Sequence, residues 1–238
     1  MGAAAAPQQS RRARLRAETS AEIKAVALRL LGEGGPDAIS LRAIAREMGM
    51  TAGAIYGYYD SRDTLVTALI GDVYGSLLTA VEAARDAVPA DDPAGRIVAW
   101  GLALRAWALE NPEGFRLVYG DPVPGYRAPE DSPAAEANHR ACAGLTGLVA
   151  AAWPRAGEVQ PGTAEWSDFD DALVRQVQAE FPGLPPGAVA LSLRVWARMH
   201  GPVALEVYGH LGRQARDPEA LYRAELGDLV RSLGLAGA

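Results

Sequence analysis

The sequence predicts an all-α protein with a three-helix N-terminal domain followed by a larger helical bundle. Apolar residues recur at the three- and four-residue spacing of amphipathic helices in one segment after another. Glycines and prolines separate these segments, as expected where helices end. No stretch alternates apolar and polar residues as a half-buried strand would. These three observations together exclude a sheet as the organising element of the fold.

The first helix is predicted over residues 18–32. Its apolar positions repeat at helical spacing, and Gly34, Gly35 and Pro36 follow as a stop signal. The apolar residues that define its buried face are Ile23, Val26, Ala27, Leu30 and Leu31. Residues 1–17 precede this helix and are predicted to form a disordered basic arm.

The next two helices are short and lie within the segment SLRAIAREMGMTAGAIYGYYDSRDTL, residues 40–65. Ser40 can cap a helix through Met48, and Gly49 can adopt the positive φ of a tight turn. Thr51 can then cap a second helix that ends at Tyr56. Two helices joined this closely must cross steeply, which is typical of a helix-turn-helix whose second helix enters a DNA major groove. The N-terminal domain is therefore placed at residues 18–64, with the helix-turn-helix at about 40–59.

A long fourth helix should start after an Asp60 or Ser61 cap and link the two domains, with apolar positions at Leu65, Leu69, Val73, Leu77 and Val81. The second domain is therefore placed at residues 65–238. Its helices are predicted, by periodicity and by flanking prolines or glycines, over residues 93–110, 112–119, 133–153, 168–181, 186–212 and 218–233.

Composition excludes several classes of protein. No apolar run approaches the roughly 18 residues that a membrane-spanning helix needs, so we expect no membrane association and a cytoplasmic location. Cys142 is the single cysteine, which rules out an intrachain disulfide and a multi-cysteine metal site. The patterns of zinc proteases, P-loop proteins and nucleophile elbows are missing. We therefore expect no catalytic residue, no metal and no cofactor.

Charge is distributed unevenly along the chain. The net charge is −6, yet residues 1–70 hold nine basic and seven acidic residues, so the positive end coincides with the helix-turn-helix. The tract RRARLR contributes Arg11, Arg12, Arg14 and Arg16. Such a tract serves either as a solubilising tail or as an arm that contacts DNA phosphates or the minor groove.

The helix-turn-helix segment resembles the TetR family of transcriptional regulators. The motif that carries the resemblance is met by Ser40, Leu41, Arg42, Ile44, Ala45, Met48, Gly49, Met50, Thr51, Ile55, Tyr56, Tyr58, Tyr59, Ser61, Arg62 and Leu65. Tyr58 stands where histidine is frequent, Tyr59 where phenylalanine is, and Arg62 where lysine is. None of these departures removes a hydrogen-bond donor or a charge.

The resemblance implies that Arg42, Thr51, Tyr56, Tyr58 and Arg62 contact DNA phosphates, while Tyr59 is buried. Hydroxyl and guanidinium groups near helix N-termini suit that role. The recognition helix offers Thr51, Ala52, Gly53 and Ala54 to the bases, and these side chains are too small for bidentate base contacts. Sequence preference would then come from thymine methyl contacts, from close backbone approach at Gly53 and from the arginine tract.

A second local resemblance lies in the C-terminal domain. The stretch from Trp196 through His200 and Gly201 resembles the W-x-x-x-H-G signature of one subset of the family. This helical face either packs in the interior or lines a ligand cavity. The same two alternatives hold for the stripe formed by Trp100, Leu104 and Trp107. The residues predicted to line a cavity for a small, largely apolar effector are Trp100, Leu104, Trp107, Phe115, Tyr119, His139, Cys142, Trp196 and His200.

The family resemblance also implies an assembly and a mechanism. The last two long helices would pair with their symmetry mates in a four-helix bundle, giving a homodimer on an inverted-repeat operator in double-stranded DNA. An effector would shift the fourth helix and so release a repressor from its operator. A ligand-independent DNA-binding regulator is one alternative, and a small helical enzyme is a less favoured one.

Overall fold

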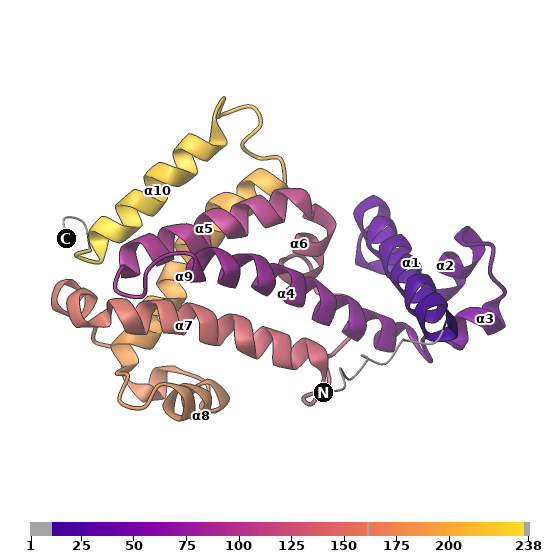
Figure 1. The fold of residues 1–238 in the computed structure, drawn as a ribbon, viewed down its shortest axis with the longest axis horizontal. Helices are drawn as coiled ribbons and strands as arrows, with labels where there is room; N and C mark the ends of the chain where they lie inside the picture. The colour runs from indigo at the N-terminus through magenta and orange to yellow at the C-terminus, as the bar shows by residue number, and fades with distance from the viewer. Residues whose placement is uncertain (1–10, 161, 236–238) are drawn as a thin grey trace, which may run out of the picture. The chain divides into compact units, whose positions relative to one another are not determined.

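The computed structural model describes residues 11–160 and 162–235, and every regular element in these ranges is helical (Figure 1). This confirms the predicted fold class. The chain divides into two compact units. The first combines the residues up to Gly71 with Glu113–Ala134, and the second combines Asp72–Pro112 with the residues from Ala135 onward.

The first unit contains the helix-turn-helix. Its elements are α1 (Arg11–Gly34), the short 3₁₀-helix η1 (Pro36–Ala38), α2 (Leu41–Glu47), α3 (Ala52–Tyr56), the start of α4 (Arg62–Asp86) and nearly all of α6 (Pro112–Tyr119). One core holds them together, and its fully buried side chains include Ile23, Ile39, Ile44, Ile55, Leu65 and Phe115. The apolar positions that define the predicted stripes of α1, α2 and α4 supply most of that core.

The second unit is built from the rest of α4 together with α5 (Pro93–Glu110), α7 (Pro133–Val159), the 3₁₀-helix η2 (Trp166–Asp168), α8 (Asp171–Glu180), α9 (Pro186–Val207) and α10 (Pro218–Ser232). Helices α5, α9 and α10 pack against one another (Figure 1). Tyr222 lies at their junction, where its buried hydroxyl is 3.2 Å from the Gly101 carbonyl oxygen and 3.1 Å from that of Met199. Burial raises the pKa of this hydroxyl, which therefore stays protonated and donates.

The N-terminal arginine tract departs from its predicted structure. Helix α1 begins at Arg11 rather than near Glu18, so residues 11–17 are helical and not a disordered arm. Arginine, alanine and leucine are among the strongest helix formers, and they extend the helix before any cap residue is reached. Residues 1–10 of the predicted arm lie outside the described residues.

Two helices of the second unit end several residues away from their predicted ends. Helix α7 continues through Pro154 to Val159, because Ala152 and Ala156 on either side of the proline are buried and their packing outweighs one missing hydrogen bond. Helix α9 ends at Val207 rather than Gly212. Gly209 has a φ of 78° there, and the amide of His210 bonds the carbonyl of Leu205 in a Schellman motif.

The predicted boundary between the domains also differs from the division in the structure. Residue 65 lies inside α4, and this helix contributes residues to both units. Residues 113–134 belong to the first unit, although the sequence predicts them to be part of the second domain. Phe115, which the sequence offers as a cavity residue, is a fully buried core residue of the first unit.

Helix α4 is long and apolar enough to cross a membrane by length and composition alone, with a mean hydropathy of 1.5 over 18 residues. Many of its apolar side chains are nevertheless buried inside the protein. Leu65, Leu69, Leu78 and Val81 are each almost completely buried. The hydropathy of α4 is therefore that of a core helix.

Candidate nucleic-acid interface

Three local hydrogen-bonding devices set the geometry of the α2 and α3 pair. The Ser40 hydroxyl accepts a hydrogen bond from the Ala43 amide at 3.1 Å and caps α2. Gly49 has a φ of 65°, and the Met50 amide bonds the Ala45 carbonyl at 2.8 Å, which closes α2 in a Schellman motif. The Thr51 hydroxyl caps α3 by accepting from the Ala54 amide at 3.2 Å. All three predicted signals are confirmed.

Helix α3 presents a face of small side chains to solvent. Ile55 is completely buried and anchors the helix, whereas Thr51 and residues 52–54 are exposed. Tyr56, at the end of the helix, is 44% exposed. A Cβ atom added to Gly53 would meet nothing within 4 Å, so the packing of this chain does not require glycine there. The exposed surface of α3 can therefore approach a partner closely with its backbone.

The two tyrosines after α3 have different environments. Tyr59 is buried, as the resemblance implies, and its hydroxyl lies 2.8 Å from the Ser20 hydroxyl on α1. Tyr58 is half-buried, and the Arg16 guanidinium lies 4.8 Å from the centre of its ring. Arg16 also donates to the Gly57 carbonyl at 2.7 Å. Arg16 is thus attached to the end of the recognition helix instead of belonging to a free arm.

Several other arginines of the first unit are exposed on its surface. Arg11, Arg12 and Arg14 lie on the first turns of α1, and Arg42 lies on the first turn of α2. Arg14 is 3.8 Å from Glu18, and that ion pair is exposed and so contributes little to stability. These guanidinium groups are accessible to anions in solvent.

Arg62 stands apart from the other predicted phosphate ligands. Its Nε donates to the Ile39 carbonyl at 2.9 Å, Nη2 to Pro36 at 2.9 Å, and Nη1 to Pro124 at 3.0 Å. Each guanidinium nitrogen therefore already bonds a backbone oxygen of the same unit. In this structure Arg62 fastens protein segments together, a role that the family resemblance does not indicate.

The tryptophan stripe predicted for the second unit is buried. Trp100, Leu104 and Trp107 on α5 are each about 5% exposed or less. The Trp107 indole donates to the Ser76 hydroxyl on α4 at 3.0 Å. Trp100 lies so close to α7 that a Cβ on Gly144 would be only 2.6 Å from its ring. These contacts pack the stripe against α4 and α7.

The remaining predicted cavity residues are not gathered on one element. Phe115 and Tyr119 pack against each other in the first unit with ring centres 5.1 Å apart. In the second unit, His139 is exposed and pairs with Glu180, and Cys142 is exposed on α7. Trp196 is 38% exposed on α9, and its ring centre lies 5.5 Å from that of half-buried His200. Burial lowers the pKa of His200, which favours the neutral imidazole.

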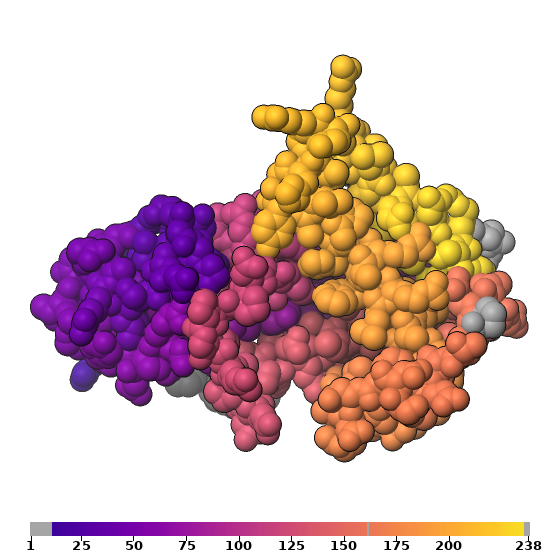
Figure 2. All heavy atoms as spheres, turned by 180° about the vertical axis from the view of Figure 1, so that it is seen from behind, coloured from indigo at the N-terminus to yellow at the C-terminus, as the bar shows by residue number. Residues whose placement is uncertain are grey.

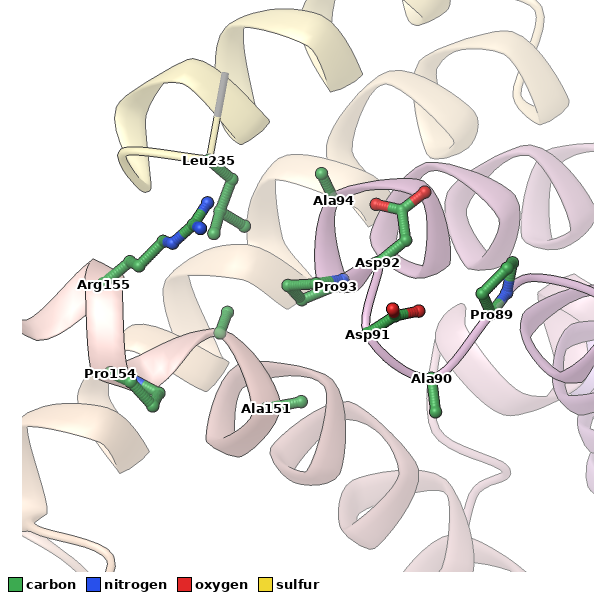
Figure 3. Close-up of a pocket in the computed structure, with 11 residues that line it drawn as sticks. Pro89, Ala90, Asp91, Asp92, Pro93, Ala94, Ala151, Pro154, Arg155 and Leu235 are labelled. Carbon is green, nitrogen blue, oxygen red and sulfur yellow. The ribbon is translucent and has the colours of Figure 1, made fainter. Parts of the chain in front are cut away.

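The second unit contains a cavity of about 500 Å³ that the sequence did not predict (Figure 3). It lies between the α4–α5 connection, α7 and the C-terminal stretch, with Asp91 and Asp92 on one wall and Arg155 on another (Figure 3). None of the predicted cavity residues lines it. Its lining comes from the α4–α5 connection, the start of α5, the second half of α7 and Leu235, so no single helical stripe in the sequence marks it.

Comparisons with known proteins agree with this architecture. Residues 23–69 match the family described as bacterial regulatory proteins, tetR family, and residues 97–229 match the tetracyclin repressor-like C-terminal domain. The HTH-type transcriptional regulators Rv1816 of Mycobacterium tuberculosis and Mb1846 of Mycobacterium bovis are each 36% identical over 223 residues, which cover 92% of this chain and 93% of the relative.

Solved structures show the same fold. The regulatory protein SCO4313 is 34% identical, with a TM-score of 0.70 over 95% of this chain and 100% of that one. A protein of unknown function from Rhodococcus sp. RHA1 is 25% identical, with a TM-score of 0.62 over 92% of this chain and 95% of that one. The helix-turn-helix geometry, the two family matches and the relatives agree, and the chain belongs to the TetR family of bacterial regulatory proteins.

Proposed function

We propose that this protein is a transcriptional regulator that binds an inverted-repeat DNA operator as a homodimer in the cytoplasm. The observation that carries the proposal is helix α3, which is capped by Thr51, exposes small side chains to solvent and follows α2 through the Gly49 turn. A short helix in that setting fits the major groove, while the preceding helix crosses the backbone. No catalytic role is proposed, and the family is one of regulatory proteins.

Phosphate contacts in this proposal come from exposed donors around α2 and α3. These are Arg42, the Thr51 hydroxyl and the Tyr56 hydroxyl, with Tyr58 beside them. Arg11, Arg12 and Arg14 extend the positive surface along α1, and helical structure fixes their spacing. Contacts to phosphates hold the recognition helix in register without reading bases.

Base reading in this proposal rests on Ala52, Gly53 and Ala54. The methyl groups of the alanines suit thymine methyls, and the open space around Gly53 permits close approach of the backbone to the DNA. Glycine inside a helix costs about 1 kcal/mol relative to alanine. Because no intramolecular neighbour calls for glycine at position 53, an external surface is the reason that we propose for it.

The outer face of α9 is our candidate for the dimer interface. Leu193, Trp196 and Leu205 on the helix, and Tyr208 at its C-cap, are large apolar residues that are between 38% and 47% exposed. The opposite side, which includes Val195, Met199 and Val203, is buried within the unit. Figure 2 shows α9, coloured amber, lying open on the surface of the second unit. Exposed apolar faces of this kind mark protein interfaces.

We propose that a small, largely apolar effector regulates DNA binding and that the protein is a repressor released by it. The chemistry behind this proposal is the aromatic and apolar composition of the second unit, together with the Trp196 and His200 pair of the W-x-x-x-H-G signature. A coupling of about 1 to 3 kcal/mol would change operator affinity roughly 5- to 150-fold. A ligand-independent regulator is the alternative, and equal operator affinities across an effector panel would favour it.

The test starts from a duplex selected by the protein from a random-sequence DNA library. We expect the enriched duplex to carry an inverted repeat and to bind two protomers, measured by fluorescence anisotropy and analytical ultracentrifugation. Arg42→Ala should weaken binding and reduce the salt dependence by about 0.9 in the slope of log K against log salt for each phosphate that it leaves without a cation. Arg213→Ala, which removes an exposed arginine between α9 and α10, is the matched control. Equal affinity for selected and scrambled duplexes would overturn the proposal.

A further inference from the structure

The connection after α6 contains a tight turn with one carbonyl directed outward. The Tyr126 amide bonds the Val123 carbonyl at 3.1 Å, with Pro124 and Gly125 at the two central positions. Gly125 has a φ of 74°, as the third residue of a type II turn requires. The Pro124 carbonyl belongs to the central peptide of the turn and takes no part in its closing hydrogen bond, so it can accept from elsewhere.

Arg62 is the donor that occupies the Pro124 carbonyl, and it joins two further backbone segments. Its guanidinium bonds Pro36 in η1 and Ile39 immediately before the Ser40 cap of α2. A planar guanidinium can serve acceptors in these three directions at once, whereas an ammonium group on a flexible stem cannot hold the same fork. The three carbonyl partners are neutral, so these hydrogen bonds are not ion pairs.

A second bond fixes the same turn to the first helical turns of α4. The Tyr126 hydroxyl lies 2.9 Å from the Thr67 hydroxyl, and Thr67 also donates to the Asp63 carbonyl at 2.9 Å. Because the Thr67 proton is engaged with Asp63, Tyr126 is the donor between the two hydroxyls. Val123, at the start of the turn, is 6% exposed. The turn is thus held by an apolar anchor, a hydroxyl pair and a guanidinium.

We propose that Arg62 is a positioning residue that locks residues 120–126 to the α1–α2 connection and thereby sets the entry of α2. It supports DNA binding through this junction and does not act as a phosphate ligand. The DNA part of this inference rests on the proposed function, whereas the junction itself does not. One consequence is that a displacement of residues 120–126 would be transmitted by the Arg62 side chain alone to the backbone next to the Ser40 cap.

The first test compares lysine substitutions on the selected duplex described above. Lysine can still bind a phosphate as a point charge, but it cannot hold the three-carbonyl fork. We expect Arg62→Lys to weaken binding about tenfold, or about 1.4 kcal/mol, and Arg42→Lys to bind nearly as the wild type does. We also expect Arg62→Ala to leave the salt slope unchanged, in contrast to Arg42→Ala. Wild-type affinity for Arg62→Lys, or a reduced slope for Arg62→Ala, would overturn the proposal.

The second test needs no DNA and so separates this inference from the proposed function. Hydrogen exchange followed by mass spectrometry reports the opening of residues 120–132 in the full-length protein. We expect faster exchange there in Arg62→Lys and in Gly125→Ala, because alanine is strained at a φ of 74°. Arg42→Lys should exchange as the wild type does. Unchanged exchange in Arg62→Lys would mean that the fork does not hold the turn, and the proposal would be wrong.

Discussion

Helices α3 and α9 are both candidate contact surfaces, yet they are specified in opposite ways. Helix α3 is a five-residue segment held by the Thr51 cap and by the single buried side chain of Ile55. Helix α9 has 22 residues, and buried apolar side chains recur along its length. Local hydrogen bonds therefore position the first, and tertiary packing positions the second.

This difference decides which substitutions each helix tolerates. A short helix has little intrinsic stability, so α3 depends on its cap and on the turn before it. The exposed residues of α3 carry no packing and are available for recognition. In α9 the outer face repeats the apolar character of the inner face, so its sequence pattern does not distinguish the core side from the contact side.

Removing a packed side chain from α9 should have the largest effect on stability. Met199 is completely buried where α9 meets Tyr222, whose hydroxyl bonds the Met199 carbonyl. Met199→Ala should lower the free energy of unfolding by about 2 to 5 kcal/mol, since it leaves a cavity in a core that can relax only in part. Urea unfolding monitored by circular dichroism measures the decrease.

The control for this prediction keeps the volume of the side chain. Met199→Leu should cost less than about 1.5 kcal/mol. If Met199→Ala costs no more than Met199→Leu, packing on its inner face does not hold α9, and the contrast with α3 fails.

A glycine in the turn before α3 and a glycine within α3 should give effects of opposite sign on stability. Gly49 has a φ of 65°, so Gly49→Ala should destabilise the protein by about 1 to 2 kcal/mol. Gly53 lies in a regular helix with open space around it, so Gly53→Ala should stabilise the protein by up to about 1 kcal/mol. Thermal unfolding of both variants at one protein concentration provides the comparison.

The same pair of variants tests recognition. Under the proposed function, Gly53→Ala should bind the selected duplex more weakly although the protein is more stable. Tighter or unchanged DNA binding by Gly53→Ala would show that close backbone approach at this position is not required.

The sequence predicts the helix-turn-helix closely because its determinants are local. Ser40, Gly49 and Thr51 each act within a few residues, and each adopts the predicted capping or turn geometry. Helices α5 and α6 have the predicted bounds for the same reason, since proline marks the start of each. The start of α1 differs from its prediction because residues 11–17 are a run of good helix formers, which extend the helix beyond the predicted first residue.

Features that depend on distant residues could not be predicted in this way. Arg62 lies 62 positions from Pro124 along the chain, and no sequence pattern reports a bond between a guanidinium and a backbone carbonyl. The grouping of residues 113–134 with the first unit is equally non-local. Buried aromatic residues such as Trp107 look alike in sequence whether they line a cavity or fill a core.

The smallest effect concerns pH and the half-buried His200 on α9. Burial lowers the pKa of His200 below its ordinary value of 6.5, whereas the unfolded chain retains that value. Between the folded and unfolded pKa values the unfolded chain binds more protons, so the free energy of unfolding rises with pH in this window. Acidification below about pH 6.5 should therefore destabilise the wild type, and His200→Gln should remove that part of the pH dependence.

Urea unfolding at pH 7.5 and pH 5.5, at a fixed protein concentration, measures this difference. His210 is exposed beyond the end of α9, so His210→Gln is the matched control and should keep the pH dependence of the wild type. Glu219, whose pKa is held low mainly by its hydrogen bond to Arg223, loses its contribution only at pH values below about 4.5, outside this range. If His200→Gln and the wild type lose equal stability on acidification, burial in the second unit does not lower the pKa of His200. Trp196 would then share an exposed apolar face with a solvated histidine, and α9 would be specified by its inner side alone.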